Sequence, residues 1–262
     1  MRLSILVFLV ALGIAAATIF FASRPFVGEG RIVDELGEVH EVVYAGPYVV
    51  IKHEPARHMV EGKDFEKMMA YVKARRESWR RWSVLLEKYG DEVYVGYVVP
   101  CRILTLEEFI ELARRLSLEG KIVKVVFHRY WKNGTYEGAG IAGIGEDEDL
   151  EKRLRWERIQ NMATVGIYLM FLQGKFDPST FNETEAAMLG EAHVDVYVGA
   201  FVVKASLKEL RELSQREEIL MVDTPLDLIW RFRERGLIVE VRRTSYGDIY
   251  LVEKKNLCTP SK

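Results

Sequence analysis

The feature that most constrains the fold is a pair of similar segments that lie about one hundred residues apart. The first reads EVYVGYVV, TLEEFIELARRL and KIVKVVF, and the second reads DVYVGAFVV, SLKELRELSQR and EILMVD. Tyr94 and Gly96 of the first copy match Tyr197 and Gly199 of the second. In each copy two β-rich runs flank a stretch with helical spacing, so the sequence predicts a duplicated βαβ unit.

Each copy also marks the start of its helix. Thr105 is followed three residues later by Glu108, and Ser206 by Glu209, which is the capping-box arrangement. Two βαβ units with right-handed crossovers, paired edge to edge, form a four-stranded antiparallel sheet covered by two helices. We therefore predict an α+β fold with a ferredoxin-like sheet. The positions expected to face one side of this sheet are Leu106, Phe109 and Leu112 in the first copy and Leu207, Leu210 and Leu213 in the second.

A long insertion, largely helical, separates the two copies. Its first part, HRYWKNGTYEGAGIAGIG, predicts a hairpin that turns at Asn133-Gly134. Its second part, residues 148–173, predicts a long helix whose C-terminal half, MATVGIYLMFL, is strongly apolar. We expect that half to be buried against the sheet or against a partner.

Further elements are expected on both sides of the repeat. Two β-rich runs between Arg31 and His53 predict a hairpin or meander, and the spacing from Lys63 to Tyr89 predicts an amphipathic helix. Residues 225–235 predict a helix ended by Gly236, followed by a strand pair, LIVEVRR and DIYLVEK. The predicted domains are an anchor at 1–25, a juxtamembrane hairpin and amphipathic helix at 26–91, and the duplicated domain at 92–262.

The N-terminus carries an uncharged apolar run from Leu3 to Ala22. Its roughly twenty residues match a hydrocarbon core of about 30 Å at a rise of about 1.5 Å per residue. A cleaved signal peptide is the alternative, but Ala15-Ala16-Ala17 offers a cleavage site only inside the apolar run. Only Met1 and Arg2 precede the run, and long domains cross membranes largely regardless of charge. We expect a single-pass anchor bound to membrane lipid, with a cytoplasmic N-terminus and an extracytoplasmic main domain.

Composition narrows the classes of partner. Lys and Arg number 37 and Asp and Glu 39, so no nucleic-acid footprint is expected. Charged residues make up 29% of the chain while Asn and Gln are scarce, a balance typical of proteins that work at high temperature. A protein partner of unknown identity remains the expected partner besides lipid.

The two cysteines and two sequons bear on an extracytoplasmic location. Cys101 and Cys258 either form a disulfide that tethers the C-terminal tail, or are two unrelated thiols. Asn133 and Asn182 each begin an N-glycosylation pattern, which matters only if the domain is external.

A glycine pattern at Gly138, Gly140 and Gly143 satisfies GxGxxG, the start of a dinucleotide site in the right context. Acidic residues open the helix that follows, from Glu146 to Asp149, and would repel a pyrophosphate. A flexible or sheet-edge glycine turn is therefore the preferred interpretation, and no cofactor is predicted.

Catalytic and metal-binding patterns are weak. Of the five histidines, only His53 and His58 lie close together with an acidic residue, Glu61, and their spacing fits no standard metal site. We expect isolated surface histidines instead. There is no GxSxG, and Cys101 has no histidine nearby in sequence. No catalytic or metal-ligating residue is predicted, and the chain is not expected to be an enzyme.

The run ARRESWRRW places Trp79 and Trp82 among four arginines. It could meet anionic lipid headgroups beside the anchor. We favour an amphipathic helix that packs its tryptophans inward and solvates its arginines.

Several stretches between Glu92 and Asp223 follow one another in a recognisable order: Thr105 to Glu108, Tyr130-Trp131 with Gly138 to Gly145, Tyr197 to Gly199, Leu207 to Leu213 and Ile219 to Asp223. This order resembles the extracytoplasmic C-terminal domain of sigma factor regulators, membrane-bound negative effectors of bacterial extracytoplasmic-function sigma factors. Those regulators hold the sigma factor with cytoplasmic sequence, whereas only Met1 and Arg2 precede the apolar run here. The resemblance therefore implies a signal-sensing or protein-binding module at the membrane.

These patterns lead to one functional expectation and one alternative. We expect a membrane-anchored extracytoplasmic binding or signal-sensing protein without catalytic activity. The alternative is an envelope hydrolase whose site is assembled from residues distant in sequence. A deep pocket lined by convergent carboxylates or histidines would favour the enzyme, and a shallow apolar patch would favour the binding protein.

Overall fold

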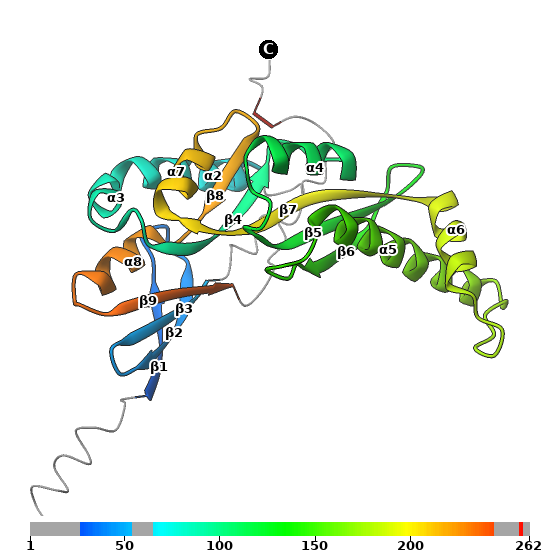
Figure 1. Ribbon diagram of the computed structural model, residues 1–262, viewed down its shortest axis with the longest axis horizontal. Helices are drawn as coiled ribbons and strands as arrows, with labels where there is room; N and C mark the ends of the chain where they lie inside the picture. The colour runs from blue at the N-terminus through cyan, green and yellow to red at the C-terminus, as the bar shows by residue number, and fades with distance from the viewer. Residues whose placement is uncertain (1–26, 54–64, 244–256, 259–262) are drawn as a thin grey trace, which may run out of the picture. The chain divides into compact units, whose positions relative to one another are not determined.

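The computed structural model describes residues 27–53, 65–243 and 257–258 of the chain (Figure 1). The protein divides into two compact units, Met1–Glu54 with Asp227–Thr244 and Pro55–Leu226 with Ser245–Lys262. This division differs from the sequence-based one, which separated residues 26–91 from 92–262. Helices α2 (Phe65–Arg81) and α3 (Ser83–Tyr89) belong to the larger unit, because they pack against its other elements.

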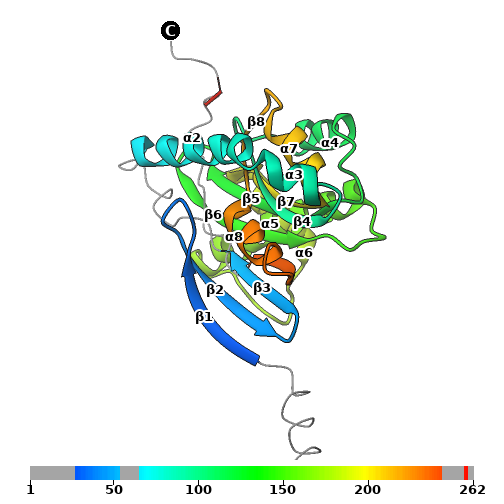
Figure 2. The same cartoon turned by 90° about the vertical axis from the view of Figure 1, so that its left-hand side faces the viewer.

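The smaller unit is a four-stranded sheet in the order β1-β2-β3-β9, and Figure 2 shows β1, β2 and β3 next to one another. The three N-terminal strands form an antiparallel meander, as predicted, while β9 pairs with β3 in parallel and sets Tyr48 beside Ile238. The expected partner strand, DIYLVEK, lies outside the described residues. The bounds are β1 Val27–Val33, β2 Val39–Ala45, β3 Tyr48–His53, α8 Leu226–Arg233 and β9 Ile238–Arg243.

The larger unit contains a five-stranded sheet in the order β6-β5-β7-β4-β8, in which all neighbouring strands are antiparallel. The four strands of the two predicted repeats therefore belong to one sheet, and the α+β prediction is confirmed. The first copy is β4 Val93–Pro100, α4 Leu106–Arg115 and β5 Ile122–Trp131. The second copy is β7 Val194–Ser206, α7 Leu207–Ser214 and β8 Ile219–Asp223.

Both repeat helices cover the same face of this sheet (Figure 1). Register places Val98 opposite Phe201, and the Phe201 ring meets Phe109 of α4 with centroids 5.1 Å apart. Gly96 lies two residues before Val98 and so on the same face of the sheet. A Cβ added at Gly96 would press against Leu210, so α7 packs on this face as well. The six apolar positions that the repeat predicted to face the sheet are all buried.

The two capping boxes are formed as the sequence predicts. Thr105 Oγ1 accepts from the Glu108 amide at 3.2 Å, and the Glu108 carboxylate accepts from the Thr105 amide at 2.9 Å. Ser206 and Glu209 repeat this exchange at 3.3 and 2.9 Å. Each box satisfies two amides that the helix itself leaves without partners.

Replacing either cap residue should therefore cost similar stability. We expect Thr105→Ala and Ser206→Ala each to lower the free energy of unfolding by about 0.5–2 kcal/mol in urea titrations. Ser83→Ala is the control, because α3 begins without a side-chain cap and should change by less than about 0.5 kcal/mol. An equal loss in all three variants would mean that the boxes contribute nothing.

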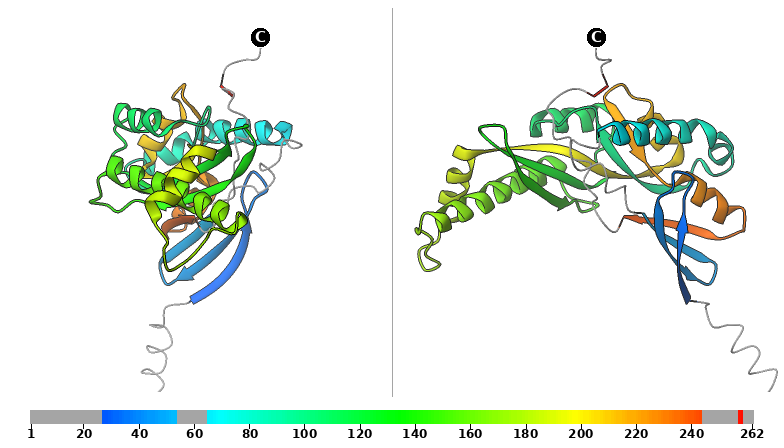
Figure 3. Two further views of the ribbon diagram at one scale, coloured as in Figure 1. Left: turned by 90° about the vertical axis from the view of Figure 1, so that its right-hand side faces the viewer. Right: turned by 180° about the vertical axis from the view of Figure 1, so that it is seen from behind.

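The insertion builds β6 (Tyr136–Gly143) and two long helices, α5 (Leu150–Leu172) and α6 (Glu183–His193). The β5–β6 hairpin turns at Asn133-Gly134, where Gly134 has a φ of +88°. Figure 3 shows α5 and α6 side by side, extending beyond the end of β5 and β6. A Cβ on Gly166 of α5 would collide with the Ala186 backbone of α6, so the two helices pack backbone against backbone.

The arginine-rich segment departs from the sequence expectation at Trp82 and at Arg75. Trp82 is only half-buried and lies between α2 and α3, so the predicted amphipathic helix is divided there. Trp79 packs inward and donates its Nε1–H to the Val222 carbonyl at 2.8 Å, as predicted. Arg75, however, is fully buried, and its Nε lies 2.8 Å from Asp223 Oδ1. Arg75 is buried because it supplies the counter-charge for the buried carboxylate of Asp223 at the end of β8. Among the described residues no helix is both long and apolar enough to cross a bilayer, and the predicted span lies outside them.

Candidate functional site

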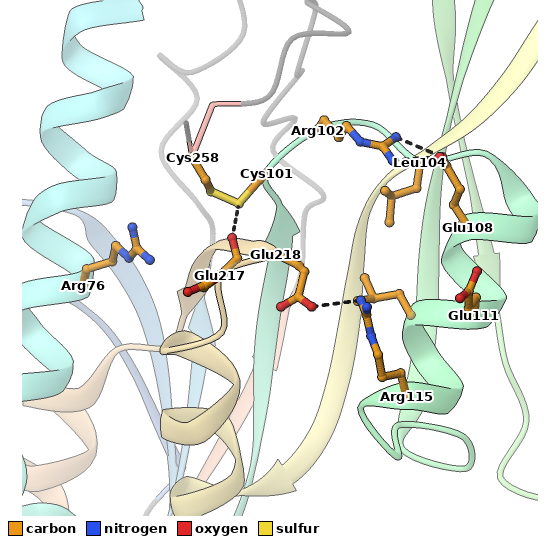
Figure 4. A pocket seen from close by; sticks show the side chains of 11 residues that line it. Arg76, Cys101, Arg102, Leu104, Glu108, Glu111, Arg115, Glu217, Glu218 and Cys258 are labelled. Carbon is orange, nitrogen blue, oxygen red and sulfur yellow. Dashed lines mark hydrogen bonds and ion pairs between the residues drawn. A yellow bond between two sulfur atoms is a disulfide. The ribbon is translucent and has the colours of Figure 1, made fainter. Parts of the chain in front are cut away.

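A pocket of about 770 Å³ opens in the larger unit where β4 ends and β8 begins (Figure 4). Helix α4 supplies one wall, because Glu108, Glu111, Leu112 and Arg115 follow one another at helical spacing and share a face. The turn before β8, helix α2 and the C-terminal cysteine complete the lining. The remaining lining residues are Arg76, Cys101, Arg102, Leu104, Glu217, Glu218 and Cys258.

Two of the four pocket glutamates are held by arginines of the same pocket. Arg102 donates to both carboxylate oxygens of Glu108 at 2.7 and 2.9 Å, and Arg115 lies 2.9 Å from Glu218. The hydrogen bonds from Arg102, together with the capping amide of Thr105, lower the pKa of Glu108 to about 2. Glu108 is therefore ionised at neutral pH and is unsuited to donate a proton.

The other charged groups of the pocket are free to meet a ligand. Within residues 65–243, the Arg76 guanidinium and the carboxylates of Glu111 and Glu217 make no ion pair. Leu104 and Leu112 add apolar surface between them. The pocket thus presents one cation and two anions beside a small apolar wall, an arrangement suited to a ligand that carries both charges.

A disulfide forms one side of this pocket. Cys101, the residue after β4, is bonded to Cys258 with Cα atoms 5.3 Å apart. The Leu257 amide donates to the Cys101 carbonyl at 2.7 Å, which adds a backbone contact to the covalent one. Cys101 Sγ also lies 3.0 Å from the Glu217 carbonyl oxygen, a contact without a proton because the sulfur is bonded. The bond ties the chain's end to the pocket.

The two sequon asparagines are exposed but are already engaged in local turns. Asn133 accepts from the Thr135 amide at 2.9 Å in the β5–β6 turn. Asn182 caps α6 and accepts from the Thr184 amide at 2.9 Å. Neither lies among the pocket's lining residues.

The GxGxxG pattern lies within strand β6 at the edge of the five-stranded sheet, and no helix begins directly at its last glycine. A Cβ on Gly140 would press against Asn161 of α5, and one on Gly138 against Arg129. These two glycines therefore allow α5 and the Arg129 side chain to approach the strand closely.

The expectation of surface histidines is wrong for His40, His53 and His128, which are 0%, 2% and 1% exposed. His40 and His53 bring their Nδ1 atoms within 3.2 Å, and His40 Nε2 lies 3.2 Å from Asp34. His40 lies two residues before the buried Val42, and His53 two residues after the buried Ile51, so each shares the inward face of its strand. This period-of-two pattern was the signal that sequence reasoning missed. His193 is exposed at the end of α6, and His58 and Glu61 lie outside the described residues.

His128 lies in a cluster of aromatic rings on the five-stranded sheet. Its ring meets Tyr136 edge-on, and Tyr130 makes similar contacts with Tyr136 and Tyr197. Burial lowers the pKa of His128 to about 4 and raises that of Tyr130 to about 12, so both side chains are neutral at pH 7. Neutral rings in edge-to-face contact serve packing rather than proton transfer.

Neither the described histidines nor the carboxylates form a metal centre. Across residues 27–53 and 65–243, no group of three or more histidine, cysteine, aspartate or glutamate side chains is arranged to hold an ion. The pocket beside the disulfide is therefore the best candidate site.

Comparison with known proteins identifies no relative of this chain. No family model, curated protein or solved structure matches the chain. The resemblance to sigma factor regulators stays a prediction, and the function has to be argued from the site itself.

Proposed function

We propose that this protein is a membrane-anchored extracytoplasmic binding or signal-sensing protein that recognises a charged peptide segment of a partner protein. The observation that carries the proposal is the pocket beside the disulfide, with Arg76, Glu111 and Glu217 available around an apolar wall. A peptide offers ammonium, guanidinium and carboxylate groups together with apolar side chains, and so complements this lining.

Catalysis is the less favoured use of the same pocket. Convergent carboxylates are what a hydrolase needs, but Glu108 is held ionised by Arg102 and Glu218 is paired with Arg115. The Arg102–Glu108 pair fixes charge in place without providing a proton donor, and Glu218 is already engaged by Arg115. Glu111 and Glu217 are the pair that a hydrolytic mechanism would have to use.

The full chain in detergent, dialysed against a library of tetrapeptides with free termini, tests this proposal. We expect peptides that carry both charges to be retained over neutral ones. Glu111→Gln with Glu217→Gln should weaken retention about fivefold, for a loss of about 1 kcal/mol from partly exposed charges. Glu87→Gln, an exposed glutamate of α3 outside the pocket, is the matched control.

Each outcome of the dialysis decides between the candidates. Equal retention by the wild type and the double variant would refute binding in this pocket. Appearance of shortened peptides with the wild type, absent with the double variant, would support the hydrolase instead.

We also propose that the repeat forms a ferredoxin-like fold extended by β6 and the α5–α6 insertion. The order β5-β7-β4-β8 with antiparallel neighbours supports this assignment, because the two crossover units then interleave their strands. The resemblance to the outer domain of sigma factor regulators is consistent with a sensing role for such a domain.

A further inference from the structure

The free end of the α5–α6 hairpin exposes large apolar side chains to an unusual degree. Sequence reasoning expected the C-terminal half of α5 to be covered, and Met162, Ala163, Val165 and Gly166 are indeed buried. Beyond them no residue from Ile167 to Phe181 is buried. The large apolar residues at least one-third exposed there are Tyr168 at 54%, Phe171 at 69%, Leu172 at 62%, Phe176 at 36% and Phe181 at 41%.

This apolar end is an ordered surface. Gly174, with a φ of +65°, closes α5, and the Lys175 amide returns to the Met170 carbonyl at 2.9 Å. Asp177 accepts from the Ser179 amide at 2.9 Å and from its hydroxyl at 2.7 Å. The rings of Phe176 and Phe181 then meet with centroids 5.9 Å apart. The side chains are therefore held outward by the backbone of the turn.

Charge is almost absent from the same end. Helix α5 carries six charged residues between Glu151 and Arg158 but none from Ile159 to Leu172. In the turn that follows, Lys175 and Asp177 cancel. The hairpin therefore changes from a charged base to a neutral, aromatic-rich end, which matches the chemistry of a lipid bilayer interface, where aromatic residues are enriched.

The shape of the apolar surface favours a bilayer over a protein groove. A protein groove binds an amphipathic helix through apolar side chains at positions i, i+3, i+4 and i+7 along one helix face. Here Tyr168, Phe171 and Leu172 begin such a face, but the exposed residue one turn earlier is Thr164. The apolar surface instead continues past the helix end to Phe176 and Phe181. It is a cap on the hairpin, suited to end-on insertion.

We propose that the end of the α5–α6 hairpin, residues 167–181, enters the interfacial layer of a lipid bilayer. The chain's apolar run from Leu3 to Ala22, the predicted anchor, would hold the protein at such a surface, so the hairpin end provides a second lipid contact. Lys175 supplies the one cation of this segment, and its ammonium suits the headgroup region. This inference does not depend on the peptide pocket.

The test is a depth measurement on the full chain in phosphatidylcholine vesicles. Phe171→Cys is labelled with an environment-sensitive fluorophore, since the two native cysteines are bonded to each other. We expect quenching by lipids that carry a spin label near the headgroup end of the acyl chain, at a depth of about 5–10 Å. Asp147→Cys, exposed before the charged base of the hairpin, should be quenched only by aqueous iodide.

A second substitution separates the hairpin from the label itself. Phe176→Glu in the Phe171→Cys protein should abolish lipid quenching and restore quenching by iodide, because a charge beside the label opposes insertion. If iodide quenched the labelled Phe171→Cys protein in the absence of the Phe176→Glu substitution, the proposal would be overturned. Shielding from both quenchers would also overturn it, because a second copy or a partner protein would then cover the hairpin end.

Discussion

Replacing Arg75 with methionine is expected to lower the free energy of unfolding by about 3–5 kcal/mol. The side chains of Arg75 and Asp223 are both fully buried and lie 2.8 Å apart. Arg75 also donates to the Tyr71 hydroxyl at 3.0 Å and to the Thr224 carbonyl at 3.0 Å. Methionine fills most of the volume but leaves a buried carboxylate without its cation, and that desolvation dominates the loss.

The double variant Arg75→Met with Asp223→Leu distinguishes an ion-pair effect from a packing effect. Because both charges are then removed, we expect urea titration to recover most of the stability lost by Arg75→Met alone. Lys132→Met, which breaks an exposed pair with Asp195, is the surface control and should cost less than about 1 kcal/mol. No recovery in the double variant would show that shape, not charge, sets the cost.

Removal of the Cys101–Cys258 disulfide is the second large effect. We expect Cys101→Ser with Cys258→Ser to lower the free energy of unfolding by about 2–5 kcal/mol. The two cysteines are 157 residues apart, so the bond closes a long loop and restricts the unfolded chain strongly. Cys101 is also buried, and Leu257 is hydrogen-bonded to it, so the native tail loses its contact as well.

Reduction of the wild type provides the control for this second prediction. The melting temperatures measured with and without a dithiol reductant should differ for the wild type and agree for the double variant. Coincident melting of oxidised and reduced wild type would mean that the bond contributes no stability. Retention of the tetrapeptides in the dialysis assay, measured on the double variant, then reports whether the tail also shapes the pocket.

Local signals were enough to predict the repeat and its elements. A Ser or Thr followed by Glu three residues later gave both helix starts, because capping depends only on adjacent backbone donors. Asn133-Gly134 gave the β5–β6 turn, because glycine accepts the positive φ that such a turn requires. The right-handed crossover rule predicted the arrangement within each copy, whereas the shared sheet also required the assumption that the two copies pair edge to edge.

Burial was harder to predict when a polar residue lay on an inward position. His40 and His53 lie on the same strand faces as the buried apolar residues of β2 and β3 and so belong to the core, although each was treated as a surface residue from its type. Arg75 was expected in water because the carboxylate that neutralises it lies 148 residues further along the chain, at Asp223. Residue type alone does not reveal a distant partner.

The sequence by itself therefore determined the repeat, its capped helices, the β5–β6 turn and the apolar character of the second half of α5. Only the tertiary structure decided that β9 pairs in parallel with β3, that Cys101 meets Cys258, and that α2, α4 and the turn before β8 enclose one pocket. The reason is the range of the interactions. Caps, turns and periodicity act between residues a few positions apart, whereas strand partners, buried charges and pocket walls depend on contacts between segments that the chain brings together only when it folds.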